Sequence, residues 1–284
     1  MNSHGEAHLT SHYGHLVVCN LEELGHLAAV GPLLASIWGG GGSPTAMPVN
    51  LLVAILHSGG YVGGAFDDGE LVAASVGFLA MRNGVIELHS HVTGVTVDFQ
   101  SSGVGRALKE HQRRWAASQG IAGITWTFDP LSRRNGWFNL VKLGARAVSY
   151  HPNFYGEMPD AQNGNDETDR CMAYWSTGEP FPQNALRTPA GHESQVALEV
   201  GVDERPVRVP ADLDSPVIAC QVPQDIVSIR KADPTLARSW RLELRAVMGS
   251  AMRAGYIATS ITGDGVYSLL HASLLEAPTL ASQV

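Results

Sequence analysis

A glycine-containing turn at residues 100–106 is the segment of this sequence most suited to binding a charged ligand. It reads Gln-Ser-Ser-Gly-Val-Gly-Arg and stands between a β-like segment and a segment with helical apolar spacing. A strand-to-helix turn with few bulky side chains exposes several backbone N–H groups, and the helix adds the positive end of its dipole. The turn is therefore predicted to hold phosphate groups, although such a turn can also be only a tight connection.

Two familiar phosphate-binding arrangements do not account for this turn. A Walker loop requires Gly-Lys-Ser or Gly-Lys-Thr, which the segment lacks, and a dinucleotide fold places its glycine turn after a first parallel strand. Here the turn follows three strand-like segments, Tyr61–Asp67, Glu70–Ala80 and Val85–Val97, separated by turn signals at Asp68-Gly69 and Asn83-Gly84. The sequence therefore predicts an antiparallel meander before the turn.

The last of these strands carries ionisable side chains at alternate positions. Glu87, His89 and His91 are two residues apart, so on a strand they point to the same side. Imidazole titrates near neutral pH and can accept a proton from a protonated amine, directly or through water. His91 and His89 are therefore candidate bases, and Glu87 is the alternative. All three could instead be ordinary core or surface residues.

Residues 95–108, Val-Thr-Val-Asp-Phe-Gln-Ser-Ser-Gly-Val-Gly-Arg-Ala-Leu, resemble the acyl-CoA-binding signature of the GNAT superfamily of N-acyltransferases. Gln100, Gly103 and Gly105 match its defined positions, and Ser101 stands where the family often has a further glycine. The resemblance implies acetyl-CoA or another acyl-CoA as co-substrate. The implied cofactor-binding residues are Val95, Val97, Gln100, Ser101, Ser102, Gly103, Val104, Gly105, Arg106 and Asn135.

The likeness continues downstream as far as Trp175. Trp126–Leu131, Lys142–Gly144, Asn153–Met158 and Asp169-Arg170 look like a subgroup of predicted GNAT acetyltransferases, some relatives of which are linked to N-succinylation of amino acids. This resemblance implies the α/β GNAT fold, with a mixed, mostly antiparallel central sheet flanked by helices. It implies transfer of an acetyl or succinyl group to the amine of a small molecule, an amino acid being one candidate. A non-catalytic acyl-CoA-binding module of the same fold is the alternative.

The resemblance also assigns catalytic roles. The family base commonly lies on the strand before the pyrophosphate loop, which places His91 first and His89 next. The family's usual tyrosine position falls on Leu140, which cannot donate a proton. Tyr155 and Tyr150 are the substitutes for a general acid, or solvent protonates the leaving thiolate.

Polar residues gather at the start of the predicted helix Ser132–Leu143. Arg133 and Arg134 could each hold a carboxylate of the substrate or of a succinyl group in bidentate fashion, and Asn139 completes the predicted substrate-binding set. A solvated helix end is the alternative for either arginine.

The remaining chain supplies the elements that must position these residues. Beyond Thr177, prolines and charges as far as Pro223 predict a long connection with little regular structure. The other elements expected here are helices at Leu21–Ile37, Val49–His57, Gly103–Gln119 and Pro234–Ala254, strands at His15–Asn20, Ile121–Phe128, Ala145–His151, Arg170–Trp175 and Asp225–Arg230, and a hairpin at Tyr256–Leu270. These elements suggest a flexible leader at 1–14, a catalytic domain at 15–177, and a C-terminal α+β extension at 178–284 that packs on it.

Composition limits the partners. The 284 residues carry 19 basic and 27 acidic side chains, a net charge of −8, which disfavours nucleic acid and anionic membranes as partners. Three distant cysteines, Cys19, Cys171 and Cys220, predict reduced thiols, and the leader histidines have no further ligands at metal-binding spacing. We therefore expect a cytoplasmic protein with a small-molecule amine substrate and no metal, and retain a homodimer as an option.

Overall fold

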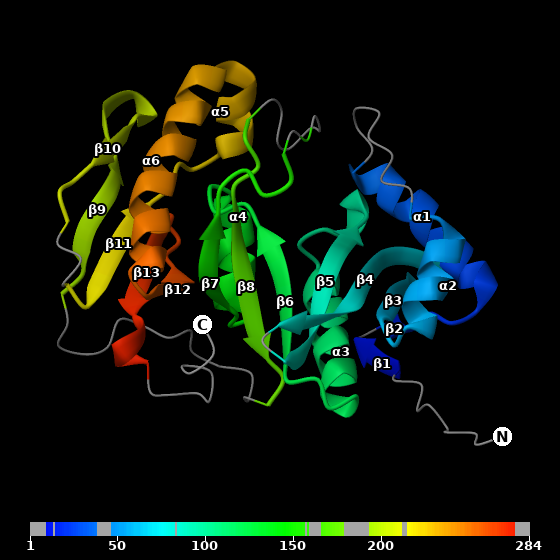
Figure 1. Cartoon of the computed structure of the whole chain (residues 1–284). Helices are drawn as coiled ribbons and strands as arrows, with labels where there is room; N and C mark the ends of the chain where they lie inside the picture. Colours follow the sequence, from blue (N-terminus) through cyan, green and yellow to red (C-terminus); the bar gives the residue numbers. More distant parts are fainter. Residues whose placement is uncertain are drawn as a thin grey trace. The chain divides into compact units, whose positions relative to one another are not determined.

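The computed structural model describes residues 10–13, 15–38, 47–82, 84–156, 158, 166–178, 193–211 and 215–275 (Figure 1). The chain divides into two compact units, Met1–Thr125 and Trp126–Val284. Each unit combines β-strands with helices, which confirms the α/β class and the mixed, mostly antiparallel strand pairing.

The first unit is built on the predicted meander. Its strands pair in chain order, each antiparallel to the next, and the first residues of β6 (Gly123–Phe128) then pair in parallel with β5. The strands are β1 (Thr10–Tyr13), β2 (Leu16–Asn20), β3 (Tyr61–Asp67), β4 (Glu70–Arg82) and β5 (Val85–Val95). β1 lies in the segment expected to be a flexible leader, so that expectation is wrong for these four residues; residues 1–9 and 14 lie outside the described part.

Helices cover both faces of the meander. α1 (Leu24–Trp38) packs on β4 and β5, and α2 (Val49–His57) packs on β3 and β4. α3 (Val104–Ser118) packs on β2 to β5 (Figure 1). The neighbouring residues Ala73 and Ala74 of β4 belong to two different hydrophobic clusters, with α3 and with α1 and α2 respectively. Because successive side chains of a strand point to opposite faces, the two clusters form cores on the two sides of the sheet.

The second unit has its own strand order, β8-β7-β12-β13-β11-β9-β10, antiparallel except for the β11–β9 pair. The strands are β7 (Arg146–His151), β8 (Arg170–Ser176), β9 (Gln195–Val200), β10 (Pro206–Arg208), β11 (Val217–Gln221), β12 (Tyr256–Ile261) and β13 (Val266–His271). Its helices are α4 (Arg133–Gly136), the π-helix η2 (Trp137–Lys142), α5 (Ile226–Ala232) and α6 (Pro234–Arg253); the short 3₁₀ turns of the chain are η1 (Val97–Phe99), η3 (Val202–Glu204) and η4 (Ala272–Leu274). No helix in the described ranges is long and apolar enough to cross a membrane.

Two expectations for the C-terminal part are wrong. The supposedly irregular connection contains β9, β10 and β11, although residues 179–192 and 212–214 lie outside the described part. The segment expected as a strand from Asp225 is the helix α5, because the Asp225 carboxylate accepts the backbone N–H groups of Val227 at 3.0 Å and Ser228 at 3.1 Å. An aspartate bonded in this way is a helix N-cap, which apolar alternation does not reveal.

A buried ion cluster connects α5 and α6 to Asp129, which follows β6, and to Asp166, which precedes β8. The Arg241 guanidinium donates to Asp129 at 2.9 Å and to Asp166 at 3.1 Å, and Arg230 reaches the same two carboxylates at 2.7 and 3.1 Å. Arg241 is only 1% exposed. Together with the pairing of β12 with β7, these contacts connect α5, α6 and β12 to segments of the second unit that precede residue 177.

Candidate functional site

The glycine turn lies at the N-terminus of α3 in the first unit. Gly103 is the N-cap residue, and no side chain caps the helix, so its first backbone N–H groups have no side-chain acceptor there. The first N–H groups of an α-helix also lack an acceptor within the helix. The turn therefore presents backbone donors and the positive end of a helix to any anion that approaches.

Two residues of this turn have left-handed backbone conformations. Gly103 has φ +98° and Ser101 has φ +65°. Ser101 occupies the position at which the resembling family often has glycine, and glycine is the residue that adopts positive φ most readily. Side-chain contacts hold the turn from within: Ser102 Oγ donates to the Phe99 carbonyl at 2.6 Å, and Gln100 Nε2 donates to the Val95 carbonyl at 3.4 Å.

β5 brings the two predicted histidines onto one face of the sheet. Both imidazoles pack against the ring of Phe78 on β4, with ring centroids 5.2 Å away for His89 and 5.8 Å for His91. Val76 pairs with Val92 and Gly77 with Ser90, so His91 is an extra residue of β5, at a β-bulge. Bulges often re-aim a side chain near an active site.

The far edge of β5 is largely open. Its parallel pairing with β6 consists of Leu88 with Ile124 and His89 with Thr125. Beyond His89, β5 has no ladder partner on this side among the described residues. Backbone N–H and C=O groups at such an edge can bond to a ligand that carries amides.

The environment keeps both histidines neutral near pH 7. Burial, with smaller contributions from His91, Lys109 and Arg82, lowers the pKa of His89 to about 4. Partial loss of hydration also lowers the pKa of His91 below its usual range. A base works best with a pKa near the working pH, so a pKa of about 4 makes His89 poorly suited, and its ring also lies 3.3 Å from the Thr125 hydroxyl. His91 therefore stays the first candidate.

Glu87 lies deeper than the two histidines. Desolvation raises the pKa of its carboxyl group, while Arg82, 3.7 Å away, lowers it by a smaller amount. Oε2 of Glu87 is buried and accepts no hydrogen bond from the described residues. Glu87 thus keeps the chemistry of the alternative base, with a pKa closer to neutrality than that of an ordinary glutamate.

A buried lysine behind β5 was not foreseen. Lys109 of α3 is only 3% exposed and donates from Nζ to Ser90 Oγ at 2.9 Å and Gln112 Oε1 at 3.1 Å. Gln112 in turn donates to Ser75. Ser90 lies between the two histidines, so Lys109 supports the backbone of the bulge. Its burial has no signal in the sequence, because only packing brings Ser90, its partner on β5, next to α3.

Lys109 predicts a specific dependence of stability on pH. Burial lowers its pKa to about 7, whereas an unfolded lysine titrates near about 10.4. Between these values the unfolded chain binds more protons, so the unfolding free energy should rise with pH by up to about 1.4 kcal/mol per pH unit. Urea unfolding of Lys109→Met should lose this rise, and the exposed Lys231→Met control should keep it. An equal slope in both variants would contradict the prediction.

The two candidate general acids, Tyr150 and Tyr155, lie in the second unit. Tyr150 is buried and donates to Asp169 at 2.6 Å, and burial raises its pKa well above the usual range, which favours a structural role. Leu140 is fully buried. Tyr155 is exposed, its hydroxyl lies 2.8 Å from Thr127 Oγ1, and the Arg170 guanidinium is 5.6 Å from its ring.

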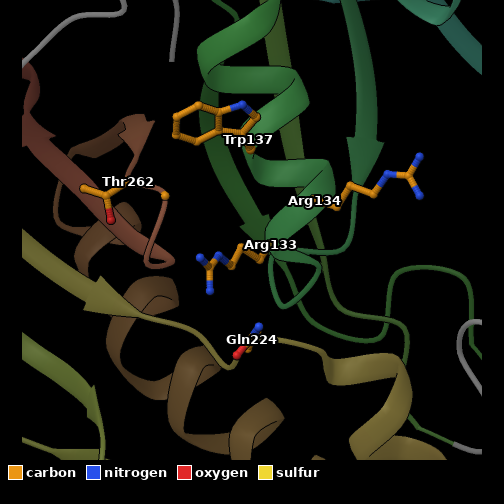
Figure 2. Close-up of a pocket in the computed structure, with 6 residues that line it drawn as sticks. Arg133, Arg134, Trp137, Gln224 and Thr262 are labelled. Carbon is orange, nitrogen blue, oxygen red and sulfur yellow. The ribbon is translucent and has the colours of Figure 1, made fainter. Parts of the chain in front are cut away.

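The predicted substrate-binding residues, which lie on α4 and η2, have different surroundings. The Asn139 amide oxygen accepts the indole N–H of Trp126 at 3.1 Å within the core, an arrangement that favours a structural role. Arg133 lines a cavity of about 270 Å³, whereas the guanidinium of Arg134 runs in the opposite direction, as Figure 2 shows. Asn135 is exposed. The helix predicted at Ser132–Leu143 is present, but its second half is a π-helix.

Comparison with protein-family models and with curated proteins found no match. Solved structures similar to this chain include a ribosomal-protein-S5-alanine acetyltransferase from Vibrio fischeri (12% identity, TM-score 0.46, 60% of this chain and 98% of that chain). A ribosomal-protein-S18-alanine N-acetyltransferase from Escherichia coli is also similar, with 14% identity and a TM-score of 0.44 over 60% of this chain and 99% of that chain. A GNAT family acetyltransferase from Elizabethkingia anophelis with acetyl-CoA bound has 17% identity and a TM-score of 0.42, over 58% of this chain and 99% of that chain. The function proposed below rests on the residues of this chain.

Proposed function

We propose that this chain is an acyl-CoA-dependent N-acyltransferase that moves an acetyl or succinyl group to the amine of a small molecule. The observation that carries the proposal is the continuity of β5 with the turn and α3. One stretch, residues 87–106, offers candidate bases, an open strand edge and an uncapped helix N-terminus in that order.

The order of these features suits the parts of coenzyme A. The pyrophosphate would bind the backbone donors between Gln100 and Arg106, at the positive end of α3. The amides of the pantetheine arm would pair with the open edge of β5, which leads back toward His91. The thioester would then lie near the end of the arm, beside the candidate bases. Asn135 stays a proposed contact for the pantetheine arm.

The proposed reaction is a direct transfer. His91 accepts a proton from the ammonium form of the acceptor, and the neutral nitrogen attacks the thioester carbonyl carbon. The new C–N bond forms as the C–S bond breaks, the second amine proton passes to solvent, and the thiolate takes a proton from water. Tyr155 stays the sequence-based candidate for a general acid. Much of the rate would come from holding the two reactants in position.

Gly103→Val is expected to weaken coenzyme A binding at least about tenfold, because a β-branched residue cannot readily keep φ +98° and would distort the donors. An added Cβ at Gly103 would meet no atom of the protein, so the variant should fold. Isothermal titration with coenzyme A measures the loss. Gly69→Val is the matched control, since Gly69 also has positive φ and open space. Equal affinity in both variants would remove the binding proposal.

A non-catalytic acyl-CoA-binding module is the competing function, favoured by Leu140 at the usual tyrosine position. Titration with coenzyme A does not separate the two, because both bind it. Thiol release from acetyl-CoA and succinyl-CoA, measured with a panel of amines and amino acids, does separate them. Tight binding without thiol release for any acceptor would favour the module.

A further inference from the structure

The cavity of about 270 Å³ in the second unit has an unusual lining for a surface hollow. It is formed by Arg133, Arg134, Trp137, Gln224, Thr262 and Gly263. Figure 2 shows the Arg133 guanidinium directed into the space between Gln224 and Thr262, with the Trp137 ring on another side. Three segments far apart in the sequence thus converge on one hollow: α4 with η2, the residue before the α5 cap, and the β12–β13 turn.

The stem of Arg133 passes close to Gly265, and its guanidinium has no counter-ion among the described residues. A Cβ at Gly265 would lie 3.2 Å from Cδ of Arg133, so the glycine leaves room for the arginine stem to pass. The guanidinium has no hydrogen-bond or ion-pair partner among the described residues. Three other arginines of this unit, Arg230, Arg241 and Arg245, are paired with carboxylates. A half-buried guanidinium without an anion is unusual, since Arg carries five donors that seek acceptors.

The neighbouring side chains can complete an anion site. Within the described part of the chain, neither the Gln224 amide nor the Trp137 indole N–H has a hydrogen-bond partner. The nearby Asp225 carboxylate is already occupied, because it caps α5 through Val227 and Ser228. The hollow therefore combines one cation, further donors and an aromatic wall.

We propose that this cavity binds the carboxylate of a small molecule whose apolar body lies on the Trp137 ring. The planar fork of Arg133 matches a carboxylate in bidentate geometry, with the Gln224 amide as an additional donor. A single inward cation balances a monoanion, whereas a phosphate group carries about 1.5 to 2 negative charges at neutral pH. As an acceptor site for the carboxylate of an amino acid, the assignment rests on the proposed acyl transfer. As a binding site, it stands independently.

The test is a titration of the full-length protein with phenylacetate, with phenylacetamide as the neutral match and inorganic phosphate as the competing anion. Tryptophan fluorescence and calorimetry report binding. We expect saturable binding of phenylacetate, and binding of phenylacetamide and of phosphate that is at least about tenfold weaker, because the amide lacks the charge-assisted bond and phosphate lacks a second cation. Equal binding of phenylacetamide or of phosphate would overturn the carboxylate assignment.

Variants locate the site. Arg133→Met keeps an unbranched stem beside Gly265 but removes the cation, so it should weaken phenylacetate binding at least about tenfold. Gln224→Glu should weaken binding by a similar factor, because it places a negative charge in the hollow. Arg238→Met changes the net charge equally at an exposed position of α6 and should leave affinity within about twofold. Unchanged binding in Gln224→Glu, which alters only an exposed side chain, would overturn the proposal even if Arg133→Met failed to fold.

The same proteins separate this inference from the proposed function. Thiol release with amino acids and with their amides gives the second readout. If phenylacetate binds as described but no acceptor releases thiol, the carboxylate site stands and the acyltransferase proposal fails. If thiol is released equally with L-phenylalanine and L-phenylalaninamide, and Arg133→Met changes neither the turnover nor phenylacetate binding, the carboxylate site fails and the acyltransferase stands.

Discussion

Replacing His91 with alanine is expected to lower turnover about a hundredfold or more while leaving the affinity for coenzyme A nearly unchanged. The bulge in β5 presents this side chain as an extra residue beside Phe78, whereas the pKa of His89, lowered to about 4, makes that residue a poor base near neutral pH. Loss of a general base affects the chemical step, because the proposed cofactor contacts are backbone groups of β5 and of the turn at 100–106, which the substitution leaves in place. Steady-state thiol release and calorimetry measure the two quantities separately.

The pH profile gives an independent readout of the same residue. Since the environment lowers the pKa of His91, its imidazole remains neutral, and able to accept a proton, below the ordinary histidine value of about 6.5. The acid limb of turnover should therefore bend below that value and disappear in His91→Ala. His57→Ala, an exposed histidine at the end of α2, is the control.

Two outcomes would redirect the assignment. A large loss in His89→Ala with normal turnover in His91→Ala would move the role to the more buried imidazole. Near-normal turnover and unchanged profiles in both variants would make the histidines structural, packed on Phe78. Glu87, whose pKa is raised by desolvation, would then be the base to test.

The largest expected effect on stability comes from the buried ion cluster. Arg241→Met should lower the unfolding free energy by about 3–5 kcal/mol, because the Asp129 and Asp166 carboxylates lose their most buried counter-ion. Arg208→Met is the matched control, since that arginine is exposed and pairs with Glu243 at 2.7 Å. The control should cost about 1 kcal/mol or less. Urea unfolding followed by circular dichroism measures both, and equal midpoints would contradict the prediction.

The cluster also predicts acid sensitivity. Arg241 and Arg230 hold the pKa of Asp129 well below its usual range, although desolvation opposes them. A carboxyl group with a depressed folded pKa contributes its full stability above its unfolded pKa of about 3.9, and this contribution is lost as the pH falls toward the folded value. Stability should therefore decline below about pH 4. Arg241→Met should show a shallower decline, because the pKa of Asp129 would be less depressed without this counter-ion.

The sequence by itself determined the local features of this protein. Alternating apolar residues with turn signals at Asp68-Gly69 predicted the meander, and β3 has the predicted bounds Tyr61–Asp67. Apolar helical spacing predicted α2 and α3, and the hairpin β12–β13 was also expected. These features depend on periods of two or 3.6 residues and on turn chemistry, which a short window of sequence contains. The pairing of His89 and His91 on one face followed from the same period.

Only the tertiary structure decided which polar groups are buried and what they contact. Lys109 reads as a surface lysine, yet it lies beneath β5 because Ser90 and Gln112 satisfy its ammonium group. Asp129 and Arg241 stand 112 residues apart and meet in a single ion cluster. Arg133 was predicted as a substrate contact, but Gln224 and Thr262, which line the same cavity, come from segments that no spacing rule connects. Long-range contacts of this kind depend on the packing of whole elements, so a local pattern does not contain them.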